Sequence, residues 1–356
     1  MELSFWEQKL PFEYPFTISN GRTKTHQHSL MVRLSLGNWQ GFGEAPAIVY
    51  YNVTVEGMME QLEKHRKVIE KFALIDPERF WHFLHHLFPN DPFLVCALDM
   101  AGWDLWGQMK KQPLHQLWNT TWLTESSNNE NEVLPPICDY TLGIDPIEKM
   151  VQKMEAHPWP IYKVKVGTDY DIEMITALRK YTDKPIRVDA NAGWTTEEAL
   201  VKIPALANLG VELVEQPLAK DNWEGMEQLK KQSLLPLFAD ESCVFEKDVA
   251  VCANYFHGIN IKLTKCSGLT PALRMIKEAR ALGLKVMMGS MNESVIGSAA
   301  IAQFLPQIDY VDMDGPLLMT ELNGVGLQYS FENNNGKIEP LVRPGLGVQY
   351  RTPFVK

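Results

Sequence analysis

Short apolar runs recur about every 25 residues between positions 136 and 311, and a longer segment with helical apolar spacing follows each one. Eight strand–helix units in about 190 residues favour a parallel sheet closed into a TIM-type (β/α)8 barrel, in the α/β class. The alternative, a doubly wound open sheet, needs a Gly-rich first turn, and no GxGxxG follows a strand here. The runs are Pro136–Tyr140, Tyr162–Val166, Ile186–Val188, Val211–Val214, Leu237–Ala239, Ile259–Ile261, Val286–Met288 and Tyr310–Val311.

The N-terminal part of the chain has a different pattern of apolar residues. Up to about residue 55 the sequence alternates in the manner of antiparallel strands, with a turn at Gly37-Asn38, and from Val55 to Trp118 the apolar spacing is helical. Strands followed by segregated helices predict an α+β unit. A polar stretch over 119–132 is typical of a linker. We therefore expect an α+β capping domain over 1–125, joined by the tail 326–356, and a barrel over 126–325.

Composition excludes several classes of partner. The chain has 34 Lys and Arg against 44 Asp and Glu, a net charge of −10, so a nucleic-acid partner is not expected. No run reaches the roughly 18 apolar residues that span a bilayer, and no secretory signal is recognisable. The five cysteines are scattered without a CxxC, which favours reduced thiols and a cytoplasmic location. We expect a homo-oligomer with no membrane partner.

Nearly every predicted barrel strand ends in an ionisable residue. The carboxyl ends of the strands form the face of a barrel where active sites are built. Asp189, Glu215 and Asp240 on three consecutive strands offer only oxygen ligands, which favours Mg²⁺ or Mn²⁺. The alternative is that each carboxylate caps the helix that follows it.

The same pattern of charged strand ends indicates two candidate catalytic lysines. Lys165 and Lys262 end the second and sixth strands, on opposite sides of the three acids, so they can exchange protons with one carbon from opposite faces. Lys265 competes with Lys262 for this role. The alternative is that these are solvated surface lysines. Three histidines at 82, 85 and 86 include an i, i+4 pair but no third ligand, and we interpret them as packing or surface residues.

The motifs resemble those of the enolase superfamily, in its muconate-lactonizing-enzyme subgroup, and are most similar to the dipeptide epimerases, such as the L-Ala-D/L-Glu epimerases. The resemblance covers nearly the whole chain. Its motifs are GFGEAP (41–46), ALDMAGWDL (97–105), KVKVG (163–167), VDANAGW (188–194), VEQPL (214–218), ADES (239–242), NIKLTKCSG (260–268) and PGLGV (344–348). The chain departs from the family after the sixth strand, where Cys266-Ser267-Gly268 stands in place of the more common double Gly.

The resemblance implies a fold, a metal and a reaction. It implies an enolase-like modified barrel in which Asp189, Glu215 and Asp240 bind one Mg²⁺ per subunit, with Mn²⁺ as a substitute. Lys262 holds the family position and acts with Lys165 as the acid/base pair. The implied reaction is a 1,1-proton transfer at the α-carbon of the C-terminal residue of an Ala-Xaa dipeptide, Ala-Glu or Ala-Ala-like, through a metal-stabilised enediolate.

A pair of carboxylates at the eighth strand suggests which member of the subgroup this is. In the dipeptide epimerases, a pair such as Asp312 and Asp314 holds the α-ammonium of the dipeptide. The alternative functions are N-acylamino acid racemase, o-succinylbenzoate synthase and muconate-type cycloisomerase, whose substrates have no such ammonium. The alternative role for the two acids is a helix cap or salt-bridge acceptor. A catalytically silent binding protein has no need of two opposed bases.

Further substrate contacts are expected around this centre. Lys163, Asn191 and Glu293 are expected to support the site or contact the substrate. The cap loop 18–28 is expected to reach over the barrel mouth and set side-chain specificity, with Arg22 and Lys24 as cations available for an acidic side chain.

Overall fold

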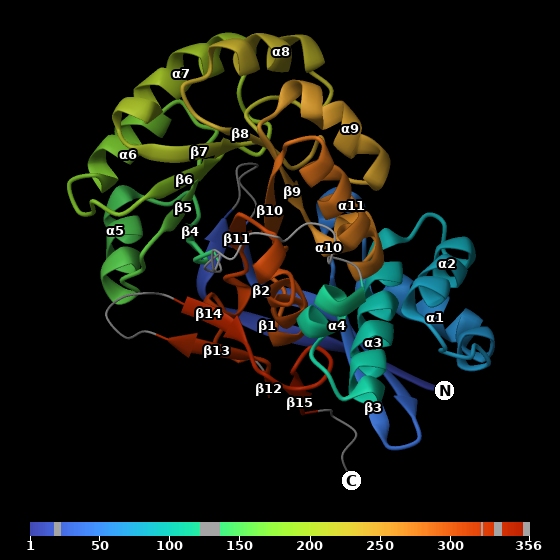
Figure 1. Ribbon diagram of the computed structural model, residues 1–356. Coiled ribbons are helices and arrows are strands. Elements are labelled where there is room, and N and C mark those ends of the chain that lie inside the picture. The colour runs from blue at the N-terminus through green and yellow to red at the C-terminus, as the bar shows by residue number, and fades with distance from the viewer. Residues whose placement is uncertain (18–22, 122–135, 322, 331–336, 352–356) are drawn as a thin grey trace.

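A computed structural model of the chain describes residues 1–17, 23–121, 136–321, 323–330 and 337–351. Its central feature is a sheet of eight parallel strands whose order in space follows the chain from β4 to β11 (Figure 1). An isolated parallel bridge between Cys138 and Val311 joins the first strand region to the last. The strands are β4 (Tyr140–Leu142), β5 (Tyr162–Lys165), β6 (Ile186–Asp189), β7 (Val211–Glu215), β8 (Leu237–Ala239), β9 (Gly258–Ile261), β10 (Lys285–Gly289) and β11 (Tyr310–Asp312).

Helices on the outside of this sheet connect successive strands (Figure 1). The predicted barrel is confirmed, and an open doubly wound sheet is excluded by the consecutive strand order. The short helix α10, directly after β9, was not predicted. The helices are α5 (Ile147–Ala156), α6 (Asp171–Leu178), α7 (Thr196–Asn208), α8 (Trp223–Gln232), α9 (Glu246–Tyr255), α10 (Leu263–Cys266), α11 (Leu269–Ala281) and α12 (Val295–Ala302).

The eighth unit differs from the other seven. After β11 the described residues form the 3-10 turn η3 (Gly315–Leu317) in place of an α-helix. The backbone beyond it is used by the cap, because Glu13 N–H donates to Leu318 O at 2.9 Å and Thr320 N–H donates to Pro11 O at 3.0 Å. The eighth strand therefore leads the chain back to the N-terminal sheet.

The cap begins with an antiparallel sheet in the order β1 (Glu2–Thr17), β2 (Thr23–Leu36) and β3 (Trp39–Pro46), as predicted. After it come η1 (Val49–Tyr51), α1 (Val55–Glu70), α2 (Pro77–Leu87), α3 (Pro92–Lys110) and α4 (Leu114–Thr121). The predicted linker over 119–132 was placed too early, because α4 continues to Thr121; residues 122–135 lie outside the described part of the chain.

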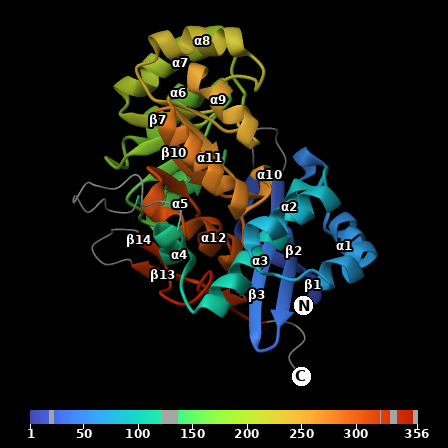
Figure 2. The same cartoon turned by 45° about the vertical axis from the view of Figure 1, so that its right-hand side comes forward.

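Helix α3 holds the cap sheet and the barrel together, and Figure 2 shows it between β3 and the barrel helices α10 and α11. A Cβ at Gly43 would lie 1.9 Å from Ala97 O, and one at Gly41 would lie 2.2 Å from Ala101 O, so only glycine lets β3 lie this close to the helix. Trp103 Nε1 donates to Thr270 Oγ1 on α11 at 2.9 Å.

The C-terminal tail also contacts α3. It forms the small strands β12 (Gly324–Val325), β13 (Leu327–Ser330), β14 (Lys337–Pro340) and β15 (Gln349–Tyr350). Leu346 N–H donates to Asp104 Oδ1 at 2.8 Å, and Gln108 Nε2 donates to Pro344 O at 2.9 Å. No helix among the described residues is long and apolar enough to cross a membrane.

Candidate active site

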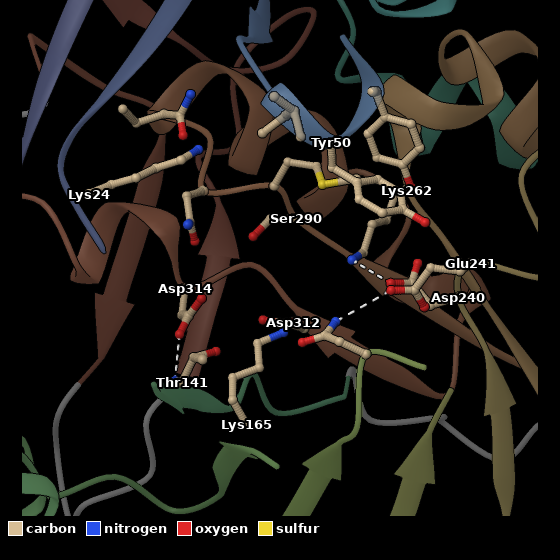
Figure 3. A pocket seen from close by; sticks show the side chains of 16 residues that line it. Lys24, Tyr50, Thr141, Lys165, Asp240, Glu241, Lys262, Ser290, Asp312 and Asp314 are labelled. Carbon is tan, nitrogen blue, oxygen red and sulfur yellow. Dashed lines mark hydrogen bonds and ion pairs between the residues drawn. The ribbon is translucent and has the colours of Figure 1, made fainter. Parts of the chain in front are cut away.

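The charged residues predicted at the strand ends meet at the carboxyl face of the barrel, around a cavity of about 280 Å³ (Figure 3). Parallel register places Lys165 beside Asp189, and Asp189 beside Glu215. The barrel residues lining the cavity are Thr141, Lys165, Asn191, Asp240, Glu241, Lys262, Ser290, Met291, Asn292, Asp312 and Asp314, and the cap contributes Lys24, Gln27, Ile48, Tyr50 and Tyr51.

The three predicted metal ligands are buried carboxylates, with exposed fractions of 0% for Asp189, 0% for Glu215 and 3% for Asp240. Burial alone would raise the pKa of Asp189, but the ammonium groups of Lys165 and Lys163 outweigh it and lower the pKa to about 2. Burial likewise opposes ionisation of Asp240, but Lys262 and Lys265 lower its pKa below the ordinary range. Both side chains are therefore held as anions.

The negative charge of Glu215 is less fully compensated by neighbouring cations. Burial, and then the charge of Asp189, raise its pKa. Its Oε1 accepts from Asn260 Nδ2 at 2.8 Å, while its Oε2 lies 2.7 Å from Lys163 Nζ in an ion pair that lacks hydrogen-bond geometry. Because this oxygen accepts no hydrogen bond, a metal cation would compete for it with the Lys163 ammonium.

The donor set fits a hard divalent cation in type, charge and burial, since all three side chains supply only oxygen. In the described part of the chain, no three His, Cys, Asp or Glu side chains lie close enough together to coordinate one ion as they stand. Lys163 lies among them, with its Nζ 3.3 Å from Asp189 Oδ2 and 2.7 Å from Glu215 Oε2. Side-chain rotation is therefore required to bring the three carboxylates to one ion.

The two predicted catalytic lysines point into the same cavity from different sides (Figure 3). Lys165 Nζ donates to Asp189 Oδ2 at 2.6 Å, and Lys262 Nζ donates to Asp240 Oδ2 at 2.9 Å. Lys265 does not line the cavity; it is 1% exposed and donates to the backbone and side chain of Asp240. The geometry therefore favours Lys262 over Lys265 as the residue that faces a substrate.

Lys163 is 2% exposed and does not line the cavity. Its Nζ contacts Asp312 Oδ2 at 2.6 Å in addition to Glu215 and Asp189. Burial alone would lower its pKa, but these carboxylates raise it well above the ordinary value. Lys163 is thus a fixed cation that links the predicted metal ligands to the eighth strand.

The two acids of the eighth strand both line the cavity but have different partners. Asp312 is paired with Lys163, whereas Asp314 Oδ2 accepts from Thr141 N–H at 2.6 Å. Burial, followed by the charge of Asp312, raises the pKa of Asp314 to about 7. A cation that enters the cavity beside Asp314 would find a carboxyl group not already neutralised by a lysine.

Of the remaining residues predicted to contact the substrate, the structure places some in the cavity and others outside it. Asn191 and Lys24 line the cavity, whereas Glu293 lies behind its wall, where it is 3% exposed and accepts from Met291 N–H. Burial, and then the charge of Glu44, raise the pKa of Glu293 to about 8. Arg22 lies outside the described residues.

Sequence reasoning missed several cavity residues, above all Tyr50 and Tyr51 of the cap and Glu241 of the barrel. The tyrosines directly follow the segment GEAPAIV (43–49), and an aromatic pair between a strand and a helix is a signal that could have been noticed. Glu241 adjoins Asp240, and burial, then Asp240, raise its pKa to about 7. Its Oε2 is buried and accepts no hydrogen bond.

Residues 146–353 match the family described as Enolase C-terminal domain-like. The chain belongs to this family. It is 48% identical to an L-Ala-D/L-amino acid epimerase of Flavobacterium johnsoniae over 94% of this chain and 98% of that protein. It is 35% identical to an L-Ala-D/L-Glu epimerase of Bacteroides thetaiotaomicron, over 98% and 88%.

Solved structures that are similar to this chain include dipeptide epimerases. A substrate-liganded L-Ala-D/L-Glu epimerase of Bacillus subtilis superposes with a TM-score of 0.89 at 28% identity, covering 99% of both chains. A dipeptide epimerase of Enterococcus faecalis, complexed with Mg and L-Leu-L-Tyr, gives a TM-score of 0.87 at 29% identity, over 98% and 99%. The enolase-superfamily resemblance drawn from the motifs is confirmed, and the chain is an isomerase of the epimerase class.

Proposed function

We propose that this chain is a Mg²⁺-dependent dipeptide epimerase that inverts the α-carbon of the C-terminal residue of L-Ala-Xaa dipeptides. The observation that carries the proposal is that Lys165 and Lys262 point into one cavity that is also lined by Asp312 and Asp314. Two opposed proton carriers suit inversion at one carbon, and two carboxylates suit a substrate with a free ammonium. The names of the relatives support the same substrate class.

The reaction divides between the two lysines. One lysine, as the neutral amine, takes the α-proton from one face of the carbon, and the other, as the ammonium, returns a proton to the opposite face. The pairs with Asp189 and Asp240 hold the two Nζ atoms in place. Asp189, Glu215 and Asp240 would hold Mg²⁺, which when bound stabilises the negative charge that develops on the substrate carboxylate.

The rest of the cavity would bind the dipeptide. Asp314, with Asp312 beside it, would accept the α-ammonium, while Asn191 and Lys24 would contact the backbone and the side chain of the epimerised residue. We further propose one Mg²⁺ per subunit, replaceable by Mn²⁺, in a homo-oligomer. All five cysteines are buried free thiols, which suits the cytoplasm.

A panel of L-Ala-Xaa dipeptides incubated with the enzyme and Mg²⁺ in D₂O tests this function. Turnover is expected to add one mass unit at the α-carbon of the C-terminal residue and to scramble its configuration. The panel should include Xaa = Ala, Val, Glu and Lys, because the cavity offers both apolar and charged walls. If no member of the panel exchanges, the proposal is wrong.

A second candidate is an N-acylamino acid racemase, o-succinylbenzoate synthase or muconate-type cycloisomerase. The observation that favours it is the 2.6 Å pair between Asp312 and Lys163, because an acid already paired with a lysine need not bind a substrate ammonium. Asp314→Asn separates the two functions. It should raise KM for dipeptides strongly if they are the substrates, and should leave turnover of N-acyl substrates nearly intact if those are.

A further inference from the structure

The helix α12 of the barrel is capped by a residue of the cap domain. Glu44, on β3, is fully buried, and both its carboxylate oxygens lie 3.0 Å from Ser294 N. Its Oε2 also accepts from Ser294 Oγ, and from Gly297 N–H at 3.2 Å. The first N–H groups of a helix have no partners within the helix, and negative charge is favoured there. Glu44 therefore fixes the start of α12 from across the domain boundary.

The turn that precedes α12 forms one wall of the substrate cavity. Ser290, Met291 and Asn292 all line the cavity. Ser290 N–H donates to Asp312 O at 2.8 Å, and Met291 N–H donates to Glu293 Oε2. Asn292 has a φ of 64°, in the left-handed region, so this turn adopts a conformation that the surrounding contacts must hold.

Close packing connects Glu44 to this turn. A Cβ at Gly297 would lie 2.4 Å from Glu293 Cβ and 3.5 Å from Glu44 Oε2, so no side chain fits between the two acids. On the other side, a Cβ at Gly315 would lie 2.4 Å from Glu293 O. The contacts thus run without a gap from Glu44 through Ser294 and Glu293 to the N–H of Met291.

We propose that Glu44 is a positioning residue for substrate binding, which holds the 290–292 turn in place through Ser294 and Glu293. It does not line the cavity, and its carboxylate accepts hydrogen bonds from Ser294 and Gly297 and not from Lys165 or Lys262. Loss of its carboxylate should therefore loosen the wall that contacts the dipeptide and leave proton transfer between the lysines unchanged. The part of this inference that concerns the dipeptide rests on the proposed function.

The test compares Glu44→Gln, which keeps the shape of the side chain, with the control Glu2→Gln, at an exposed position on β1 of the same sheet. In hydrogen–deuterium exchange, peptides covering 286–300 should exchange faster in Glu44→Gln only. With the best L-Ala-Xaa substrate of the panel, KM should rise roughly tenfold, as expected when one or two hydrogen bonds are lost, while kcat stays within about threefold. Glu44→Asp, which keeps the charge, should recover part of the loss and serves if Glu44→Gln does not fold.

An unchanged KM together with faster exchange would overturn the positioning role, because the turn would then move without effect on binding. A fall in kcat at unchanged KM would also overturn it, since that pattern reports only a smaller fraction of folded enzyme. If the wild type turns over no dipeptide, the proposed function fails separately. The exchange measurement then decides whether Glu44 holds the 290–292 turn: faster exchange over 286–300 supports this, and unchanged exchange overturns it.

Discussion

Buried ion pairs define the chemistry of individual residues at the barrel mouth. Four carboxylates and four ammonium groups form these pairs, each carboxylate with at least one lysine within 3 Å. Removal of one partner from such a pair leaves an uncompensated buried charge, so substitutions here affect both stability and function. The acids are Asp189, Glu215, Asp240 and Asp312, and the lysines are Lys163, Lys165, Lys262 and Lys265.

Replacing either Lys165 or Lys262 should stop epimerisation but not all proton exchange. Lys165→Ala and Lys262→Ala should each lower epimerisation by roughly 10²- to 10⁴-fold, because one face of the α-carbon loses its proton carrier. Each variant should still exchange the α-proton for deuterium in the epimer whose α-proton faces the remaining lysine. Chiral analysis of dipeptides after incubation in D₂O measures both effects. Lys231→Ala, at an exposed lysine on α8, is the matched control.

Turnover within tenfold of the wild type in either variant would remove that lysine from the mechanism. Melting curves of the variants in the presence of Mg²⁺ are needed beside the kinetics, because both lysines pair with buried carboxylates.

The residues found from the sequence are those whose position depends on local geometry. Lys165 and Asp189 end strands in the sequence, and the closing of the barrel then brings their side chains to one mouth. Tyr50 and Tyr51 reach the cavity only because the cap packs over the barrel, and no spacing within their own segment shows that contact. The partner of Asp312 likewise depends on tertiary packing, because Lys163 lies on a strand far away in the sequence.

At the scale of elements, α3 joins three parts of the chain through one carboxyl group. Asp104 Oδ2 accepts from Phe42 N–H of the cap sheet at 2.9 Å, and its Oδ1 accepts from Leu346 N–H of the tail at 2.8 Å. The helix was predicted from its apolar spacing, but the sequence could not show that it would be buried on nearly every side. Because of that burial, the protonation state of the Asp104 carboxyl should affect the stability of the fold.

The contribution of Asp104 to stability should depend on pH. Burial raises its pKa to about 6, although the N–H donors act in the opposite direction. Because the folded-state pKa exceeds the unfolded value, the stabilisation is full below about pH 4 and is lost as the pH rises through about 6. The stability gap between wild type and Asp104→Asn should therefore be larger at pH 4.5 than at pH 8, by about 2 kcal/mol.

Urea unfolding of the metal-free protein at the two pH values measures this gap. Asp183→Asn, at an exposed position, is the control and should show no such change. A gap that widens toward pH 8 would contradict the argument, since it would mean that the folded state favours the ionised carboxyl.

The whole molecule brings the predicted metal ligands to one face of the barrel. Asp189, Glu215 and Asp240 lie at the carboxyl ends of β6, β7 and β8 and are more than 20 residues apart in sequence, so only the closed barrel places them at one mouth. The sequence could predict this closure from the repeat of strands and helices, and the gathering of the three carboxylates from their positions at the strand ends. It could not predict that Lys163 would lie among them, because the depth of a side chain inside the barrel depends on packing from all strands.

Mg²⁺ should stabilise the folded protein, because the unfolded chain has no such site. At a Mg²⁺ concentration 100 times the dissociation constant, linkage gives about 2.7 kcal/mol, or a rise in Tm of roughly 4 °C. Glu215→Gln should remove most of this rise, whereas Glu227→Gln, an exposed acid on α8, should keep it. Differential scanning fluorimetry with MgCl₂, and with KCl at equal ionic strength, measures the effect. An equal rise with KCl, or in Glu215→Gln, would show that the stabilisation comes from general screening of the acidic surface and not from an ion held at the barrel mouth.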